Sequence, residues 1–266
     1  FDNNSSYDAF PSLYLPASQE DPTKKEFPAQ NRDDIVKQMI GMRSKFQNYK
    51  SYAVATMDQL FSKEQLKDAL ILRANNLSSS FLRNDGDGKF TLVPLPVQAQ
   101  FSALNGMVAE DFDGDGNLDV AINTNDYSTD VSVGRYDALN GLLLKGDGKG
   151  NFVPQTMLES GIYIPGNGKA LVKLRGKDGK YLLAAGQNRG PLKVFELKKQ
   201  SRFISLQPHD VSVELLFKNG KKQRQEFYYG SSFLSQSARF LKAADNVKSL
   251  TITENNGKTR KIDITP

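Results

Sequence analysis

The sequence contains no cysteine and no tryptophan, and its single histidine is His209. The absence of cysteine excludes disulfide bonds, thiolate metal sites and cysteine nucleophiles. One imidazole is too few for a zinc site that needs two or three histidines, and a Ser-His-Asp triad would have to use His209. No apolar run approaches the length of about 18 residues that a membrane-spanning helix needs. We therefore predict no transmembrane segment and no catalytic residues.

The composition is that of a folded, water-soluble protein. The chain has 266 residues, of which 38% are hydrophobic and 24% charged, enough for one large domain or two smaller ones. The first ten residues lack the basic and apolar regions of a signal peptide, so none is expected.

The net charge of +5 is unevenly distributed. From Leu197 to Pro266 there are 13 Lys and Arg against 6 Asp and Glu, a net charge of +7, so the preceding residues carry −2. This asymmetry indicates separate modules. The basic residues are not interleaved with aromatic residues, as they are on a nucleic-acid platform, so we predict a solvated lysine-rich β surface and no nucleic-acid partner.

The N-terminal quarter divides into two segments. Residues 1–30 contain four prolines, which favour an extended segment and prevent a helix or a central strand. Residues 31–76 are predicted to be helical, with Asn31 as an N-cap and further helices at 49–60 and from 62 to about 72. Four apolar residues share one face of the first helical stretch: Ile35, Met39, Met42 and Phe46.

From residue 77 the apolar period changes to two, and a repeat becomes visible. Asp-Gly turns followed by phenylalanine occur at 84–90 and 146–152, a pattern typical of hairpins. Residues 106–121 also align with 169–184 at a shift of 63. Repeated short strands of this kind predict stacked β units or propeller blades over 77–200. Alternating strands around two Asn-Gly turns then predict a small antiparallel β module at 201–266.

The sequence D-F-D-G-D-G-N-L-D at 111–119 is the strongest candidate for a metal site. Calcium binds six to eight oxygen ligands, and an acidic loop with ligands at alternate positions supplies them. Gly114 and Gly116 permit the tight winding that such a loop needs. The predicted ligands of one structural calcium ion are the carboxylates of Asp111, Asp113, Asp115 and Asp119 and the backbone carbonyl of Asn117.

Two alternatives to this site are less favoured. An EF-hand is excluded because position 12 of the loop is Ile122 rather than Glu, and because the following residues predict a strand. The second alternative is that residues 111–119 form an exposed turn that binds no metal ion. In the second repeat Gly176 and Leu182 replace the third and ninth loop residues, so we predict one ion rather than two, with Lys180 supplying part of the missing positive charge.

Polar residues follow the strand after the acidic loop and recur one repeat later. Loops on a rigid scaffold often carry binding residues, and a simple solvated connection is the alternative. The predicted ligand rim, for a glycan or a protein, consists of Asp126, Tyr127, Arg135, Tyr136, Asn188 and Arg189. The calcium ion would pin the loop between its strands and align this neighbouring rim.

The strand–D-F-D-G-D-G-N-L-D–strand unit resembles the FG-GAP/VCBS repeat, the blade of integrin-α-like β-propellers. The segment G-K-Y-L-L-A-A-G-Q-N-R-G-P-L-K-V-F at 179–195 looks like a degenerate copy. The tail, through G-S-S-F-L-S-Q-S at 230–237, resembles the ASPIC/UnbV module that often follows such repeats. The helical segment is similar to an insertion in large Bacteroidetes members.

This resemblance implies a mainly β fold with a small N-terminal helical segment: partial β-propeller-like repeats followed by a small antiparallel β module. It also implies an extracellular or surface-anchored protein, often an outer-membrane lipoprotein in a bacterium. A closed propeller needs at least four blades. We therefore expect this chain to be the C-terminal part of a longer protein, whose remainder would be a partner.

The expected function is that of a surface-exposed, calcium-stabilised module for binding or adhesion rather than turnover. The alternative is a non-catalytic or catalytic portion of a calcium-dependent polysaccharide-processing enzyme, in which calcium would bridge an acidic substrate. That alternative would require acidic residues lining a pocket beside the metal.

Overall fold

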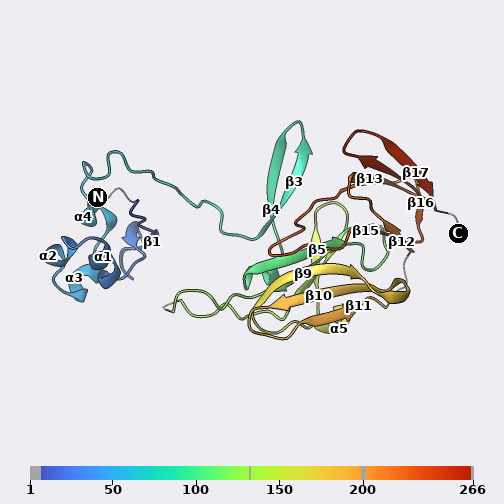
Figure 1. Ribbon diagram of the computed structural model, residues 1–266. Coiled ribbons are helices and arrows are strands. Elements are labelled where there is room, and N and C mark those ends of the chain that lie inside the picture. Colours follow the sequence, from blue (N-terminus) through green and yellow to red (C-terminus); the bar gives the residue numbers. More distant parts are fainter. Residues whose placement is uncertain (1–6, 132, 199–201, 265–266) are drawn as a thin grey trace. The chain divides into compact units, whose positions relative to one another are not determined.

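A computed structural model of the protein describes residues 7–131, 133–198 and 202–264. The chain divides into two compact units, Phe1–Asn75 and Asn76–Pro266 (Figure 1). The fold is mainly β with few helices, as the sequence predicts.

The N-terminal unit begins with a two-stranded antiparallel hairpin formed by β1 (Ser12–Pro16) and β2 (Lys24–Pro28). The prediction of an extended segment at 1–30, without a helix or a central strand, did not include this pairing. Pro16 and Pro28 are the last residues of their strands, where a missing backbone N–H costs little. Proline thus limits the length of this hairpin without preventing it.

Four short helices complete this unit: α1 (Arg32–Gln38), α2 (Met42–Lys45), α3 (Tyr49–Ala53) and α4 (Met57–Leu60). The predicted cap is confirmed, since the side chain of Asn31 accepts a hydrogen bond from the backbone N–H of Asp34. The four residues of the predicted apolar face are all buried in one core. Within the described residues, no helix is both long enough and apolar enough to span a bilayer.

Of the predicted helices, one is interrupted and another does not form. The expected helix at 49–60 is interrupted because Thr56 and Gln59 form a capping box that starts α4 anew. No helix forms at 62–72; Ser62 and Gln65 make the capping contacts, but only turns follow. Leu66 packs against the core, but Leu70, Ile71 and Leu72 are exposed, so the second half of this stretch has no apolar partner surface to stabilise a short helix.

The second unit contains the predicted hairpins and meanders. β3 (Ser80–Gly86) pairs with β4 (Lys89–Pro94). A four-stranded antiparallel sheet follows in chain order: β5 (Leu104–Glu110), β6 (Asp119–Thr124), β7 (Leu142–Gly146) and β8 (Phe152–Gln155). After the short helix α5 (Met157–Ser160), a three-stranded sheet comprises β9 (Gly168–Arg175), β10 (Tyr181–Gln187) and β11 (Lys193–Glu196).

The 63-residue repeat places β5 and β6 in positions equivalent to β9 and β10. The equivalent strands β5 and β9 lie against each other, and the side-chain amide of Asn105 donates to the carbonyl of Gly168 at 2.8 Å. Val108 and Leu171, which align in the repeat, share one buried core with Tyr181. Consecutive repeats therefore pack through their first strands.

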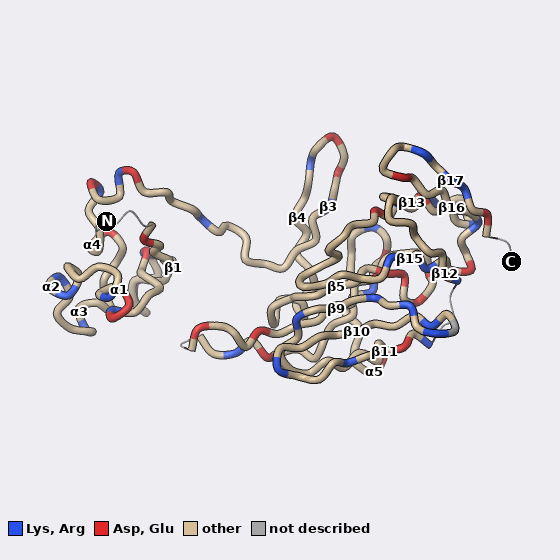
Figure 2. The backbone as a smooth tube through the Cα atoms, in the orientation of Figure 1, with Lys and Arg blue, Asp and Glu red and all other residues tan. Residues whose placement is uncertain are grey.

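The C-terminal strands form the predicted antiparallel module. Its main sheet has the order β14-β13-β16-β17, and a smaller sheet pairs β12 with β15. The strands are β12 (Arg202–Ser205), β13 (Asp210–Phe217), β14 (Lys222–Glu226), β15 (Phe240–Ala243), β16 (Val247–Glu254) and β17 (Thr259–Asp263). Figure 2 shows that Lys and Arg are distributed over several of these strands with acidic residues among them, rather than gathered in one stripe.

A serine-rich segment connects this module to the repeats. β5 and β9 are the edge strands of their sheets. The hydroxyl of Ser232 accepts from the backbone N–H of Met107, and the hydroxyls of Ser235 and Ser237 accept from N–H groups of β9 at 3.0 and 3.1 Å. Unpaired edge strands invite association with other chains. The C-terminal module thus covers two edges that the short repeat array leaves open.

Candidate metal centre and loop pocket

The acidic loop connects two adjacent antiparallel strands. Asp111 follows β5 directly, and Asp119 is the first residue of β6. Strands rather than helices flank the loop, which agrees with the exclusion of an EF-hand. The strand pairing holds the two ends of the loop close together, so its side chains must turn inward or into solvent.

Hydrogen bonds within the loop determine how it winds. The carboxylate of Asp111 accepts from the backbone N–H groups of Gly114 and Gly116 at 2.6 and 3.0 Å. Asp113 and Asp115 each accept from the N–H two residues later. Both glycines have positive φ, 82° and 86°, a conformation that other residues adopt only with strain.

The winding brings three of the predicted ligands together. One carboxylate oxygen from each of Asp111, Asp113 and Asp115 lies within 4.8 Å of the other two. Two oxygens that bind the same calcium ion are at most about 5 Å apart, because each Ca–O distance is about 2.3–2.6 Å. The donors are hard oxygens, and their spacing fits a calcium ion.

Asp119, the fourth predicted carboxylate ligand, has different contacts from the other three. It is buried, and its two oxygens accept hydrogen bonds from the backbone N–H groups of Phe112 and Gly146, each at 3.0 Å. It therefore ties the start of the loop to the end of β7. The side-chain oxygen of Asn117 accepts from Lys221 at 2.6 Å, which leaves its backbone carbonyl as the predicted contribution to the ion.

Burial raises the free energy of the negative charge in this loop. Loss of solvent raises the pKa of Asp111, although Lys242 and two backbone N–H groups act in the opposite direction. Burial also raises the pKa of Asp119. A divalent cation would offset this cost directly, because it favours the ionised form of every nearby carboxylate.

A lysine ammonium group already contacts the exposed side of the cluster. Lys145 of β7 forms an ion pair with Asp113, and its Nζ lies 3.7 Å from a carboxylate oxygen of Asp115. The hydrogen bond to Asp113 raises the pKa of Lys145. The cluster thus attracts positive charge, and Lys145 would compete with a metal ion for the same oxygens.

The C-terminal module contacts the other side of the loop. Lys242 of β15 donates to the carbonyl of Asp111, and Lys221 donates to the carbonyl of Gly116 at 3.2 Å. Asn246 donates to the carbonyl of Gly114 at 3.5 Å. Sequence reasoning missed these contacts, because they join residues more than 100 positions apart.

The equivalent loop of the second repeat contains a 3₁₀ turn, Lys177–Gly179. Lys180 pairs with Glu196 of β11 at 3.0 Å. The expectation that Lys180 would supply charge inside its own loop is therefore wrong, since its ammonium group is directed to the neighbouring strand. In the first repeat, by contrast, Lys145 contacts carboxylates of the acidic loop itself.

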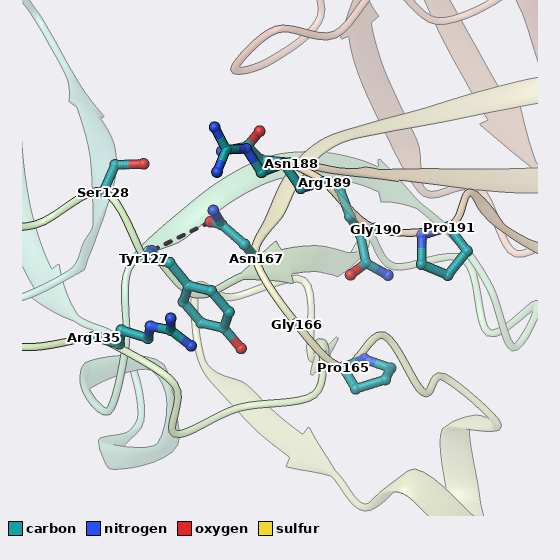
Figure 3. Close-up of a pocket in the computed structure, with 11 residues that line it drawn as sticks. Tyr127, Ser128, Arg135, Pro165, Gly166, Asn167, Asn188, Arg189, Gly190 and Pro191 are labelled. Atoms are coloured by element: carbon teal, nitrogen blue, oxygen red, sulfur yellow. Dashed lines mark hydrogen bonds between the residues drawn. The ribbon is translucent and has the colours of Figure 1, made fainter.

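Four of the six predicted rim residues meet in one pocket. The pocket has a volume of about 750 Å³, and Tyr127 and Arg135 face Asn188 and Arg189 across it (Figure 3). Asp126 and Tyr136 are not among its lining residues; their backbones pair with each other and close the base of the long β6–β7 loop.

The pocket is built from three loops. The β6–β7 loop supplies Tyr127, the segment before β9 supplies Asn167, and the β10–β11 turn supplies Asn188. The side chain of Asn167 accepts from the backbone N–H of Tyr127 at 3.3 Å and so joins two of them. The lining residues that the predicted rim omits are Ser128, Pro165, Gly166, Asn167, Gln187, Gly190 and Pro191. The turn sequence P-G-N-G at 165–168 is the signal that could have pointed to the missed segment.

The metal centre and the pocket lie at opposite ends of β6. The acidic loop precedes this strand and the rim loop follows it. Six residues of extended chain span about 20 Å. The expectation that the ion aligns a neighbouring rim is therefore wrong: the surface next to the acidic loop belongs to the C-terminal module.

A comparison with known protein families finds a match for the part of the chain that contains the acidic loop. Residues 66–122 match the FG-GAP-like repeat. The matched span includes the β3–β4 hairpin, β5, the acidic loop and the first residues of β6. The search of curated proteins found no match. The chain therefore contains an FG-GAP-like repeat, and the acidic loop lies within it.

Proposed function

We propose that this chain is a ligand-binding β-repeat module whose acidic loop holds one structural calcium ion. The supporting observation is the gathering of Asp111, Asp113 and Asp115 within 4.8 Å between two strands of the matched repeat. The ion would neutralise these carboxylates and set the conformation of the carbonyl groups to which Lys221 and Lys242 bind. Its role is to stabilise the joint between the repeat and the C-terminal module.

The proposed location is extracellular or at the cell surface, by lipid anchoring to an outer membrane in a bacterium. Calcium sites of extracellular modules have dissociation constants on the order of 10⁻⁴–10⁻³ M, and a structural ion bound this weakly would need extracellular calcium to saturate its site. Measurement of the dissociation constant tests this reasoning. A value near 1 µM would remove the link to the extracellular environment.

Thermal unfolding in calcium and in EDTA tests the metal site. At 10 mM calcium, a dissociation constant of about 0.1–1 mM stabilises the folded state by about 1.4–2.7 kcal/mol. For a unit of this size the expected rise in Tm is about 3–10 °C. Asp113→Ala should abolish the difference between calcium and EDTA.

The matched control is Asp263→Asn, which removes an exposed carboxylate that pairs with Lys261 far along the sequence from the loop. This variant should keep the full response to calcium. Equal melting temperatures of the unsubstituted chain in calcium and EDTA would refute the proposed site.

Lys145→Gln should tighten calcium binding. The ammonium group occupies oxygens of Asp113 and Asp115 that the ion needs, so its removal eliminates a competitor. An exposed ion pair contributes up to about 1 kcal/mol, which corresponds to a decrease in the calcium dissociation constant of about three- to fivefold. Calorimetric titration with calcium measures the change. Weaker binding by this variant would mean that Lys145 supports the ion-binding conformation instead.

Binding rather than turnover is favoured by the loop pocket. Within the described parts of the chain, its lining contains no Asp, Glu or His that could act as a general acid or base. The acidic loop, where calcium could bridge an acidic substrate, lies at the other end of β6. Release of reducing ends from uronic-acid polymers by the purified chain would contradict the assignment to binding.

We further propose that residues 201–266 form an ASPIC/UnbV-like module, whose role here is to cover the edges of β5 and β9. The segment that carries the resemblance, at 230–237, supplies the serine hydroxyls that bind these edges. An experimental structure of an ASPIC/UnbV module with a strand order other than that of β14-β13-β16-β17 would contradict this relationship.

A further inference from the structure

The loop pocket has a positive charge that none of the described residues neutralises through an ion pair. Arg135 and Arg189 are exposed in its lining, which contains no acidic residue among the described parts of the chain. Neither guanidinium group forms an ion pair with a described residue. Arg135 lies over the ring of Tyr127, with 4.9 Å between the guanidinium carbon and the ring centre, so its N–H groups remain available at the edge of the stack.

Two acidic side chains of the β6–β7 loop, those of Asp126 and Asp137, already have partners. Asp126 pairs with Lys169 at 2.9 Å, and the hydrogen bond to Lys169 lowers the pKa of this carboxyl. Asp137 accepts the hydroxyl of Tyr127 at 2.6 Å and also a side-chain amide hydrogen of Asn125. These contacts orient the β6–β7 loop and leave the two arginines as the charged groups that face the pocket.

The uncharged lining consists of side-chain amides beside small apolar surfaces. Asn167 and Asn188 contribute carboxamides, and Pro165 and Pro191 contribute apolar edges (Figure 3). Gln187 contributes a third carboxamide. A carboxamide both donates and accepts hydrogen bonds, as a sugar hydroxyl does.

Among these carboxamides, that of Gln187 has a buried N–H donor without a hydrogen-bond partner among the described residues. A Cβ on Gly166 or Gly190 would lie 2.5 or 2.9 Å from its Oε1, so its carboxamide occupies space that both glycines leave open. Its Nε2 is buried and has no hydrogen-bond partner among the described residues. A buried donor of this kind needs an acceptor from a ligand or a water molecule.

We infer that this pocket binds a uronic-acid residue of a glycan, with Arg135 and Arg189 binding the carboxylate and the three carboxamides binding hydroxyl groups. The inference rests on the proposed binding function and assigns the ligand class of the predicted rim. The volume lies within the range of small-ligand pockets, about 300–1,000 Å³. An acidic peptide is less favoured, because peptides commonly add to a strand edge and this pocket is formed by loops.

The test is calorimetric titration of the full chain with tetragalacturonate and with its fully methyl-esterified form. We expect the acid to bind at least tenfold more tightly than the ester, because the ester cannot accept charge-assisted bonds from arginine. Arg135→Gln and Arg189→Gln should each weaken binding of the acid about tenfold or more. Arg224→Gln removes the same charge from an exposed position in β14 and should leave binding unchanged. Melting temperatures equal to that of the unsubstituted chain would show that the variants fold.

Three results would overturn the inference: no binding of tetragalacturonate at millimolar concentration, equal binding of acid and ester, or insensitivity to both arginine substitutions. Arginine-dependent binding of hexaglutamate without binding of tetragalacturonate would assign the pocket to an acidic peptide instead. Titrations of Asp113→Ala, below its Tm, separate this inference from the calcium proposal. Calcium-dependent melting without uronate binding contradicts only the uronate inference, and the reverse result contradicts only the calcium site.

Discussion

Gly106→Ala is expected to lower the free energy of unfolding of the second unit by about 3 kcal/mol or more, an effect in the range of severe overpacking. Gly106 lies in β5 where this strand meets β9. A Cβ at this position would be 2.2 Å from the backbone nitrogen of Leu171 and 2.6 Å from the carbonyl carbon of Ala170. Both atoms belong to the main chain, so no change of rotamer can relieve the clash.

The strands would have to separate, and the core that Val108 shares with Leu171 would open. Urea unfolding followed by circular dichroism measures the loss. Gly186→Ala is the matched control, because its Cβ would meet the nearest atom, of Ala170, at an ordinary 3.6 Å. A change below about 0.5 kcal/mol for Gly106→Ala would show that the close approach of β5 and β9 is not required for folding.

Asp210→Asn is expected to destabilise the protein by about 2–4 kcal/mol at neutral pH. The side chain of Asp210 is fully buried and forms a two-pronged ion pair with Arg260, with 2.6 Å from Nη1 to Oδ1. It also accepts from the backbone N–H of Gln207 at 2.7 Å. Breaking a buried ion pair costs about 3–5 kcal/mol, and the partial exposure of Arg260 reduces that loss.

The same substitution should alter the acid dependence of stability. The hydrogen bond from Arg260 lowers the pKa of Asp210 below its value of about 3.9 in unfolded chains. A carboxyl with a lowered pKa stabilises the folded state above the unfolded value, and this stabilisation disappears as the pH falls through the folded value. The difference between Asp210→Asn and the unsubstituted chain should therefore shrink below about pH 4.

Unfolding free energies at pH 7 and pH 3 provide the measurement, with the exposed Asp263→Asn as the control. A difference that stays constant between the two pH values would show that the pair with Arg260 is not the source of the effect. Arg260 also lies 3.6 Å from a carboxylate oxygen of Glu254, so its guanidinium group contacts both acidic members of the cluster that His209, Asp210 and Glu254 form.

Local sequence patterns predicted the elements of the repeat correctly. The Asp-Gly turns predict the β3–β4 and β7–β8 hairpins because these turns need residues with positive φ, and Gly86 and Gly148 have it. The spacing of aspartates in the acidic loop predicts their convergence because each carboxylate accepts an N–H only two to five residues away. In both cases the determining contacts lie within one short segment.

The helical segment shows where local patterns were insufficient. Ser62 and Gln65 form the expected capping contacts, yet no helix follows. A short helix gains most of its stability from packing an apolar face, and after Leu66, which packs against the core, the next apolar residues, 70–72, are exposed. Capping residues determine where a helix can begin, but the available partner surface determines whether it forms.

The sequence alone was enough to predict the β repeats and the convergence of the aspartates, because both depend on contacts between near neighbours in the chain. It also excluded thiol and multi-histidine chemistry, because the chain has no cysteine and a single histidine. Only the folded arrangement placed the C-terminal lysines against the acidic loop and showed that Arg135 and Arg189, both predicted rim residues, line one pocket. These groups are separated by 54 to 131 residues, and they meet because the second repeat and the C-terminal module pack against the first. Packing between modules depends on shape and on many weak contacts, and no short motif encodes it.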